Sequence, residues 1–221
     1  PRVSEEFFDN EKDFDNVHNL IEADEHQERI AELKNVLRQR QLELYDSGLL
    51  PEQMRVRRAK ENGLMIYDMV RDEKLYPLAT YLDAADLALA RDKSNLDTFV
   101  GNLSHDDEGL RWWGIVGLHL LEQEAASATA AFETALSDDA HEIRMMAAWT
   151  LVNLGQPDQA IACLDDLLFG KCDNEDMLHN VLEWMGKPGL PLVKKYIEND
   201  GNRQGRYGIG ILGRIAELNG W

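Results

Sequence analysis

Apolar residues recur at helical spacing along most of the chain, and one pattern of polar and apolar positions repeats. Between residues 138 and 155, aliphatic and alanine side chains follow two aspartates at intervals of three to four and stop before Gly155. This spacing predicts a helix with an aspartate as its N-terminal cap and glycine as its C-terminal stop. The same order of acidic cap, aliphatic residue, arginine and small residues occurs 33 positions earlier, so that Arg111 corresponds to Arg144. The pattern therefore predicts a repeated helical unit.

Two more copies follow the same order. One covers residues 173–186, with Leu178 at the arginine position, and a looser one covers residues 206–216. Second helices are predicted between the copies, most clearly at 159–169 and 192–198. A helix pair of this period cannot bury its apolar face alone, so neighbouring pairs must stack around a shared core. The predicted fold class is mainly α, an α-solenoid of helix pairs over residues 75–221.

The first 22 residues lack a helical pattern. We expect residues 1–22 to be extended or turn-like, with a short strand at Glu6–Asp9 that has no partner strand in the chain. Phe7 and Phe8 would then need a surface supplied by another body. The sequence also begins at Pro1, without a methionine or a signal peptide. Together these features predict a piece of a longer protein.

Residues 23–50 are predicted as one amphipathic helix. Asp24 and Gln27 fit a capping box at its start, and Gly48 and Pro51 would end it. Its apolar stripe consists of Ile30, Leu33, Val36, Leu37 and Leu44. Residues 51–74 are expected to link this helix to the repeats and hold the most basic cluster of the chain.

Composition narrows the functional classes. The 221 residues include 41 acidic and 23 basic side chains, a formal net charge of −18, which opposes general affinity for nucleic acid or anionic membranes. No apolar run of about 18 residues occurs, so no membrane span is predicted. Cys163 and Cys172 stand outside any Cys-x-x-Cys or Cys/His motif, which leaves a disulfide between them open. No motif predicts a catalytic, cofactor-binding or metal-binding residue.

Two groups of residues are candidates for ligand binding. Arg55, Arg57 and Arg58 could attract a sulfated or otherwise acidic sugar, because guanidinium groups pair well with such oxygens. The alternative is a solvated charge run in a connecting segment. Trp112 and Trp113 could stack on sugar rings, or they could pack within the helical core.

The acidic caps and the arginines of the repeats are predicted to be structural. Arg111 and Arg144 are expected to reach acidic residues of the neighbouring unit, with Asp106 and Asp139 as the corresponding acidic positions. Ordered ion pairs of this kind fix the register of a repeat more than they create function.

The repeated order of acidic cap, aliphatic residue, arginine and two alanines resembles HEAT-like repeats, as found in bilin lyases and in the tails of bacterial enzymes. The resemblance covers roughly residues 75–218. It implies the solenoid fold but little about function, since such repeats serve unrelated roles.

The N-terminal segment resembles the C-terminal signature of sulfatases of the alkaline-phosphatase superfamily. The matching residues are Glu5, Glu6, Phe8, Asp9, Asp13, Asn19 and Leu20. Asn10 and Phe14 depart from the signature, where leucine and proline are usual. The resemblance implies a bacterial parent sulfatase, periplasmic or secreted, whose catalytic domain uses calcium and a formylglycine.

This resemblance implies a non-catalytic C-terminal domain. It would pack on the catalytic domain of the same parent chain or on a second subunit in a homo-oligomer, and it would shape substrate access. The alternative is a free-standing adaptor whose concave face binds a protein or peptide, with the N-terminal residues as a disordered arm. A third interpretation is an enzyme that resembles bilin lyases, which would need a pocket with a convergent acid and tyrosine.

Overall fold

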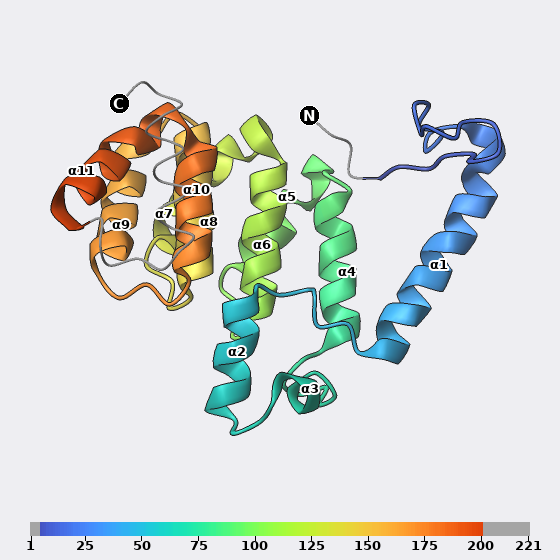
Figure 1. Cartoon of the computed structure of the whole chain (residues 1–221), viewed down its shortest axis with the longest axis horizontal. Helices are drawn as coiled ribbons and strands as arrows, with labels where there is room; N and C mark the ends of the chain where they lie inside the picture. The colour runs from blue at the N-terminus through green and yellow to red at the C-terminus, as the bar shows by residue number, and fades with distance from the viewer. Residues whose placement is uncertain (1–4, 201–221) are drawn as a thin grey trace.

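The computed structural model describes residues 5–200, and within that range the chain is mainly helical and contains no strand (Figure 1). The helices are α1 (Gln27–Leu44), α2 (Glu52–Glu61), α3 (Ile66–Met69), α4 (Leu78–Leu89), α5 (Leu96–Asn102), α6 (Glu108–Leu120), α7 (Thr129–Ala135), α8 (His141–Asn153), α9 (Pro157–Phe169), α10 (Glu175–Met185) and α11 (Leu190–Asp200). Short 3₁₀ turns lie at Asp24–His26, Lys93–Asn95, Glu122–Ala128 and Lys187–Gly189. The mainly α-helical prediction is confirmed, but the strand expected at Glu6–Asp9 does not form. None of the helices within residues 5–200 combines the length and the apolar character needed to cross a membrane.

The helices from α4 onward pack largely in sequence order. Helix α4 contacts α6, α6 contacts α8 and α8 contacts α10, while α5 packs on α6, α7 and α9 pack on α8, and α11 packs on α9. Figure 1 shows the resulting array, which runs from α4 to α11 across the molecule. The predicted copies near residues 106, 138 and 173 coincide with α6, α8 and α10. The copy predicted at 206–216 lies outside the described residues.

Short polar side chains fix the starts of two of these helices. The Asp107 carboxylate accepts hydrogen bonds from Gly109 N (2.8 Å) and Leu110 N (3.1 Å) at the start of α6. At the start of α10, the Asn174 side chain accepts one from Met177 N (3.2 Å). These bonds satisfy backbone donors that have no partner within the helix.

The start of α8 differs from its predicted cap. Ala140 is the N-cap residue, and Asp138 instead accepts a hydrogen bond from Ala140 N (2.8 Å) in the turn before the helix. The predicted stop is present, since Gly155 follows α8 with φ +78°, a left-handed conformation that suits glycine.

Residues 51–74, expected as a linker, contain α2 and α3. Met54, Ala59 and Met69 are buried and belong to the same core as the repeats. This segment is therefore an integral part of the packed helical body. Pro77 precedes α4 as its N-cap residue, in agreement with the helix start predicted there.

Helix α1 extends away from the array, at the opposite end of the molecule from α11 (Figure 1). It starts at Gln27, because Asp24 lies in a 3₁₀ turn and makes no side-chain capping bond. It ends at Leu44, before the predicted Gly48, because Tyr45 takes a left-handed conformation with φ +54°.

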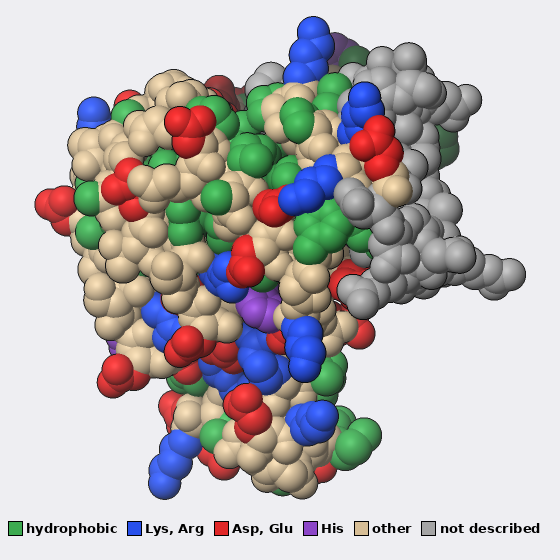
Figure 2. All heavy atoms as spheres, turned by 90° about the vertical axis from the view of Figure 1, so that its left-hand side faces the viewer, with side chains coloured by type: hydrophobic (Ala, Val, Ile, Leu, Met, Phe, Trp, Pro, Cys, Tyr) green, Lys and Arg blue, Asp and Glu red, His purple; other side chains and the backbone are tan. Residues whose placement is uncertain are grey.

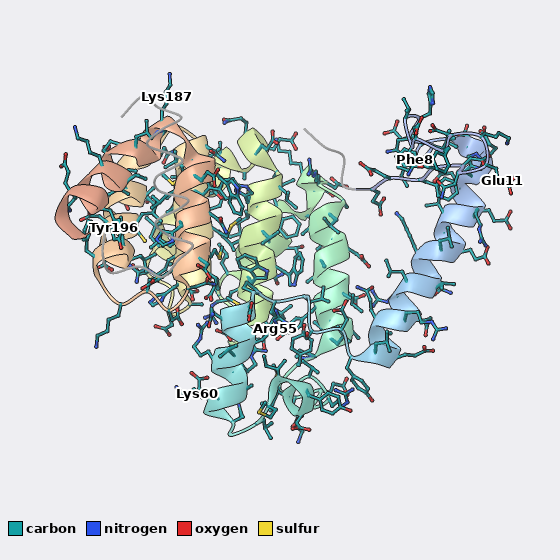
Figure 3. The ribbon with its side chains drawn as sticks, viewed as in Figure 1. Phe8, Glu11, Arg55, Lys60, Lys187 and Tyr196 are labelled. Atoms are coloured by element: carbon teal, nitrogen blue, oxygen red, sulfur yellow. The ribbon has the colours of Figure 1, made fainter. Side chains whose placement is uncertain are left out.

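The N-terminal segment folds against the start of α1. Phe7 N donates to Asn19 Oδ1 (2.8 Å), and the rings of Phe7 and His26 lie 5.4 Å apart. Figure 3 shows Phe8 and Glu11 in this loop, at the N-terminal end of α1. Phe7 and Phe8 are half-buried by the protein's own residues, contrary to the expectation that both need an outside surface.

Candidate functional site

The apolar stripe of α1 lies mostly in solvent. Ile30 is buried, but Val36, Leu37 and Leu44 are 49%, 60% and 71% exposed. Phe14, in the N-terminal loop, is 88% exposed. A helix of this length gains most of its stability by packing its apolar face, so the uncovered stripe is a candidate interaction surface. We call Leu33, Val36, Leu37 and Leu44 the α1 face.

A groove of about 630 Å³ separates α1 from α4. Leu37, Leu82 and Trp113 are among the apolar side chains that line it. Arg38 spans the groove, since its guanidinium contacts the Asp83 carboxylate across it at 2.5 Å. This polar contact joins α1 to the array without covering the α1 face.

Trp112 and Trp113 are both half-buried and pack against the core. Trp113 lines the groove beside α1, and its Nε1 has no hydrogen-bond partner among residues 5–200. The structure therefore places Trp113 at the groove, and it leaves part of each indole exposed.

Arg57, on α2, joins three successive units of the array. Its Nη2 donates to Glu108 (3.0 Å) and Glu142 (3.3 Å), and its Nη1 donates to Asp173 (2.6 Å). Glu142 is 0% exposed and also accepts a hydrogen bond from Asn174 Nδ2 (3.1 Å). Since these acids lie at or before the starts of α6, α8 and α10, Arg57 clamps three helix ends together.

The surroundings keep Arg57 charged. Burial alone would lower its pKa, but the hydrogen bond that Arg57 donates to Glu108 and the charges of Glu142 and Asp173 raise the pKa above its ordinary value. Sequence reasoning missed these acids as partners. The signal was weak, because Glu108 and Glu142 lie 34 positions apart, one more than the 33 that separate Arg111 from Arg144.

Arg58 is buried and is also paired internally. Its Nη1 donates to Leu75 O (2.8 Å) and Tyr81 Oη (2.5 Å). Ion pairs join it to Asp107 (3.2 Å) and Glu108 (3.3 Å). Neither predicted role fits this environment, because attraction of a sulfated sugar and a solvated charge run both require an exposed guanidinium.

The predicted residues are only partly brought together. Five of them line one open hollow of about 560 Å³, namely Arg57, Arg58, Asp106, Arg111 and Asp139. Arg55 points elsewhere and donates to Ser47 Oγ (2.9 Å). Figure 2 shows acidic and basic side chains intermingled on one face, with a histidine between them. Because its arginines already have carboxylate partners, the hollow is a poor site for a further anion.

Arg111 reaches the next unit through a bidentate ion pair. Its Nε and Nη2 donate to the two oxygens of Asp138 (2.8 Å and 3.0 Å). The observed partners of Arg111 differ from the predicted ones. The carboxylate is that of Asp138, where Asp139 was expected, and Asp106 accepts from Arg111 Nη1 through its main-chain oxygen (3.1 Å). The difference arises because Asp138 turns toward the start of α8, where it also accepts from Ala140 N.

Arg144, the corresponding arginine, reaches α9 instead. Its Nη2 donates to Asp166 (2.8 Å) and its Nε donates to Leu136 O (3.0 Å). Both arginines of the repeat thus connect neighbouring helices and are not free for a ligand.

Both cysteines are free thiols, so they do not form the disulfide that the sequence left open. Burial raises the pKa of the Cys163 thiol, and it raises that of Cys172 to about 11. Each is therefore protonated at neutral pH and is a weak nucleophile.

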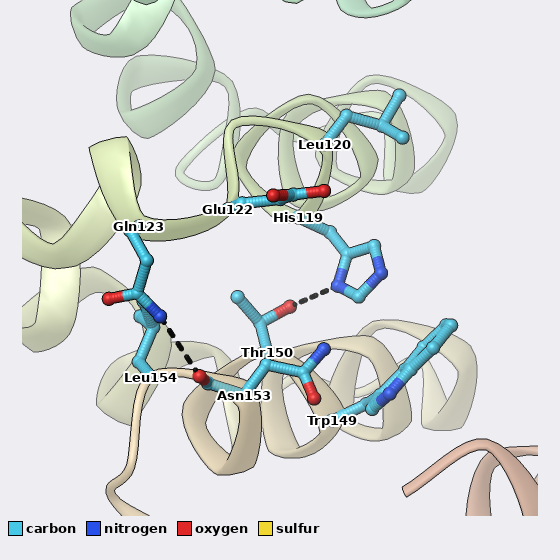
Figure 4. Close-up of a pocket in the computed structure, with 8 residues that line it drawn as sticks. All are labelled: His119, Leu120, Glu122, Gln123, Trp149, Thr150, Asn153 and Leu154. Atoms are coloured by element: carbon cyan, nitrogen blue, oxygen red, sulfur yellow. Dashed lines mark hydrogen bonds between the residues drawn. The ribbon is translucent and has the colours of Figure 1, made fainter. Parts of the chain in front are cut away.

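A third hollow, of about 450 Å³, lies between α6 and α8 (Figure 4). Within it, His119 Nδ1 lies 2.8 Å from Thr150 Oγ1, and the His119 ring lies 4.2 Å from that of Trp149. Trp184, on α10, lies 5.0 Å from Trp149. Because the Trp149 ring has aromatic neighbours on both adjoining helices, the stack joins α6, α8 and α10, while Trp184 at its end stays 54% exposed.

The buried imidazole predicts a dependence of stability on pH. Burial lowers the pKa of His119 from 6.5 to about 4. Protons then bind more readily to the unfolded state than to the folded state. The neutral imidazole therefore makes its full contribution to the free energy of unfolding above pH 6.5, and this contribution is lost as the pH falls toward 4. When the pH is lowered from 7 to 5, we expect the free energy of unfolding to fall by about 2 kcal/mol more in wild type than in His119→Gln.

Urea denaturation at both pH values measures this difference. Glutamine keeps a side-chain partner for Thr150 but cannot take up the proton. Equal losses in the two proteins would show that the imidazole is not the group responsible.

No protein-family model matches this sequence, and no curated protein matches it. The function must then follow from the geometry of the surfaces themselves. Among the candidate surfaces, the arginine hollow is engaged internally and the aromatic stack exposes one ring, that of Trp184, whereas four neighbouring apolar side chains are exposed on the α1 face.

Proposed function

We propose that this chain is a non-catalytic, HEAT-like helical domain of a sulfatase-type hydrolase, and that it packs on the catalytic domain through the α1 face. The observation that carries the proposal is the uncovered apolar stripe of α1, a helix that stands apart from the array. The resemblance of residues 5–20 to the C-terminal sulfatase signature, at the base of the same helix, supports this choice of partner.

The α1 face can supply enough energy for such a contact. Full burial of one leucine or valine side chain contributes about 1.5–3 kcal/mol. The four side chains of the face are between 39% and 71% exposed, so covering them contributes several kcal/mol. This energy is enough to dock two parts of one polypeptide, because their effective concentration is in the millimolar range.

The packing of the array supports the HEAT-like part of the proposal. Helices α6, α8 and α10 lie in consecutive contact, and each begins with the repeated acidic segment. The ion pairs of Arg57 and Arg111 cross from one unit to the next and hold the stack in register. A stack fixed in this way is suited to shape access to a neighbouring active site.

In this proposal, bond cleavage belongs to the catalytic domain, with its calcium and formylglycine. The experiment compares residues 1–221 with the intact hydrolase, at equal molar amounts with calcium present, on an aryl sulfate. We expect turnover by the intact enzyme and none above the buffer rate by this chain. Turnover by the chain alone would overturn the assignment of a non-catalytic role.

Two observations weigh against the other interpretations. The adaptor needs a disordered N-terminal arm, whereas Phe7 is bonded to Asn19 and packed against His26. An enzyme resembling bilin lyases needs a convergent acid and tyrosine. Tyr81 does donate to Asp107 (2.7 Å), but the tyrosine is fully buried and the aspartate caps α6.

A further inference from the structure

Three side chains of different chemistry converge beside the Arg57 clamp. His141 is the first residue of α8, and Cys172 and Asp173 lie in the loop before α10. Their ligand atoms, one imidazole nitrogen, one sulfur and one carboxylate oxygen, all lie within 4.8 Å of one another. Ligand atoms of one tetrahedral zinc ion lie roughly 3.2–3.8 Å apart, because metal–nitrogen, metal–oxygen and metal–sulfur distances are about 2.0–2.3 Å. Small side-chain shifts would bring these three atoms to that spacing.

The surrounding residues hold this cluster in place. His141 Nδ1 lies 2.6 Å from Asp173 Oδ1 and 3.2 Å from Asp173 N. The other carboxylate oxygen of Asp173 accepts from Arg57 Nη1 (2.6 Å). Arg57 thus orients the Asp173 carboxylate through one oxygen, while the other oxygen faces His141. In metal sites, residues outside the ligand set commonly orient carboxylate ligands by such hydrogen bonds.

We propose that His141, Cys172 and Asp173 bind a zinc ion, with a fourth coordination position open to water or another ligand. The donor set favours zinc, because imidazole, thiolate and carboxylate together suit this borderline-soft ion and do not suit calcium or magnesium. The ion replaces the contact between His141 Nδ1 and Asp173 Oδ1. On binding, the thiol of Cys172 releases its proton to solvent, and the site becomes neutral.

The site lies where α8 meets the loop that leads into α10. A metal ion there crosslinks two successive units at the edge that Arg57 already clamps. Because binding needs both units folded together, zinc stabilises the folded chain by mass action.

Cobalt(II) is the probe, since a cobalt–thiolate bond adds an absorption band that reports the sulfur ligand directly. The chain offers a matched control, because its other cysteine, Cys163, lies on α9 and hydrogen-bonds to Leu136 O. We expect wild type and Cys163→Ser to bind one cobalt ion with the thiolate band, and Cys172→Ser to lack the band. Cobalt and zinc affinity should fall at least about 100-fold in Cys172→Ser and in His141→Gln, because loss of a ligand exceeds the 10–100-fold effect of an outer residue.

Thermal unfolding gives a second readout, which compares wild type with Cys172→Ser. Zinc should raise the melting temperature of wild type, and the rise should be absent in Cys172→Ser. The proposal is overturned if wild type shows no thiolate band, if the band survives in Cys172→Ser, or if zinc leaves the wild-type melting temperature unchanged.

Discussion

Replacing Arg57 with alanine is expected to lower the free energy of unfolding by about 3–5 kcal/mol. The substitution leaves the carboxylate of Glu142 without its cation, and that side chain is fully buried. Removal of one partner from a buried ion pair has this cost because the remaining charge is uncompensated. Urea denaturation at pH 7 measures the effect.

Arg40→Ala is the matched control. Arg40 is also a helical arginine paired with a glutamate, Glu43 at 2.8 Å, but both side chains are exposed. Exposed pairs contribute about 0–1 kcal/mol, so this variant should unfold almost as wild type does. An equally small loss in Arg57→Ala would mean that the clamp does not hold the units together.

Polar substitution of the α1 face should leave the isolated chain intact and release α1 in the intact hydrolase that we propose. The variant carries Leu33→Ser, Val36→Ser and Leu37→Ser. In the isolated chain these side chains are exposed, so the stability of the array should change little. In the intact enzyme, loss of about 1 kcal/mol of docking energy at each site should speed proteolytic cleavage within residues 27–44 by about 100-fold.

The control for this experiment places serine on the opposite side of the same helix. Glu28→Ser, Glu32→Ser and Gln39→Ser make the same number of changes at exposed positions that are already polar. Cleavage of the intact enzyme should then stay within a few fold of wild type. If both triple variants are cleaved equally fast, local helix propensity explains the result and docking does not.

Local patterns predicted the helices of the array well. The apolar spacing and the stop at Gly155 depend on neighbours in sequence, so α6, α8 and α10 could be located from the residues alone. The helices of residues 51–74 could not be located in this way. Arg57 and Arg58 gave this segment the composition of a solvated linker, although acids from distant helices pair with both and Arg58 is buried.

The sequence predicted the apolar face of the candidate site but not its exposure. The stripe from Ile30 to Leu44 predicted a face that packs on something, but only the structure shows that the array leaves it uncovered. Ion pairs between units depend on the stacking distance and on turn geometry. That is why Arg111 meets Asp138 where the sequence suggested Asp139.

The measurement that tests the docking claim most directly is amide hydrogen exchange across residues 27–44. In the isolated chain we expect α1 to exchange quickly, because only Ile30 on this helix is buried. In the intact hydrolase the same amides should exchange at least about 100-fold more slowly, since several kcal/mol of burial must be broken to open the helix. Equal exchange of α1 in the two proteins would contradict the account.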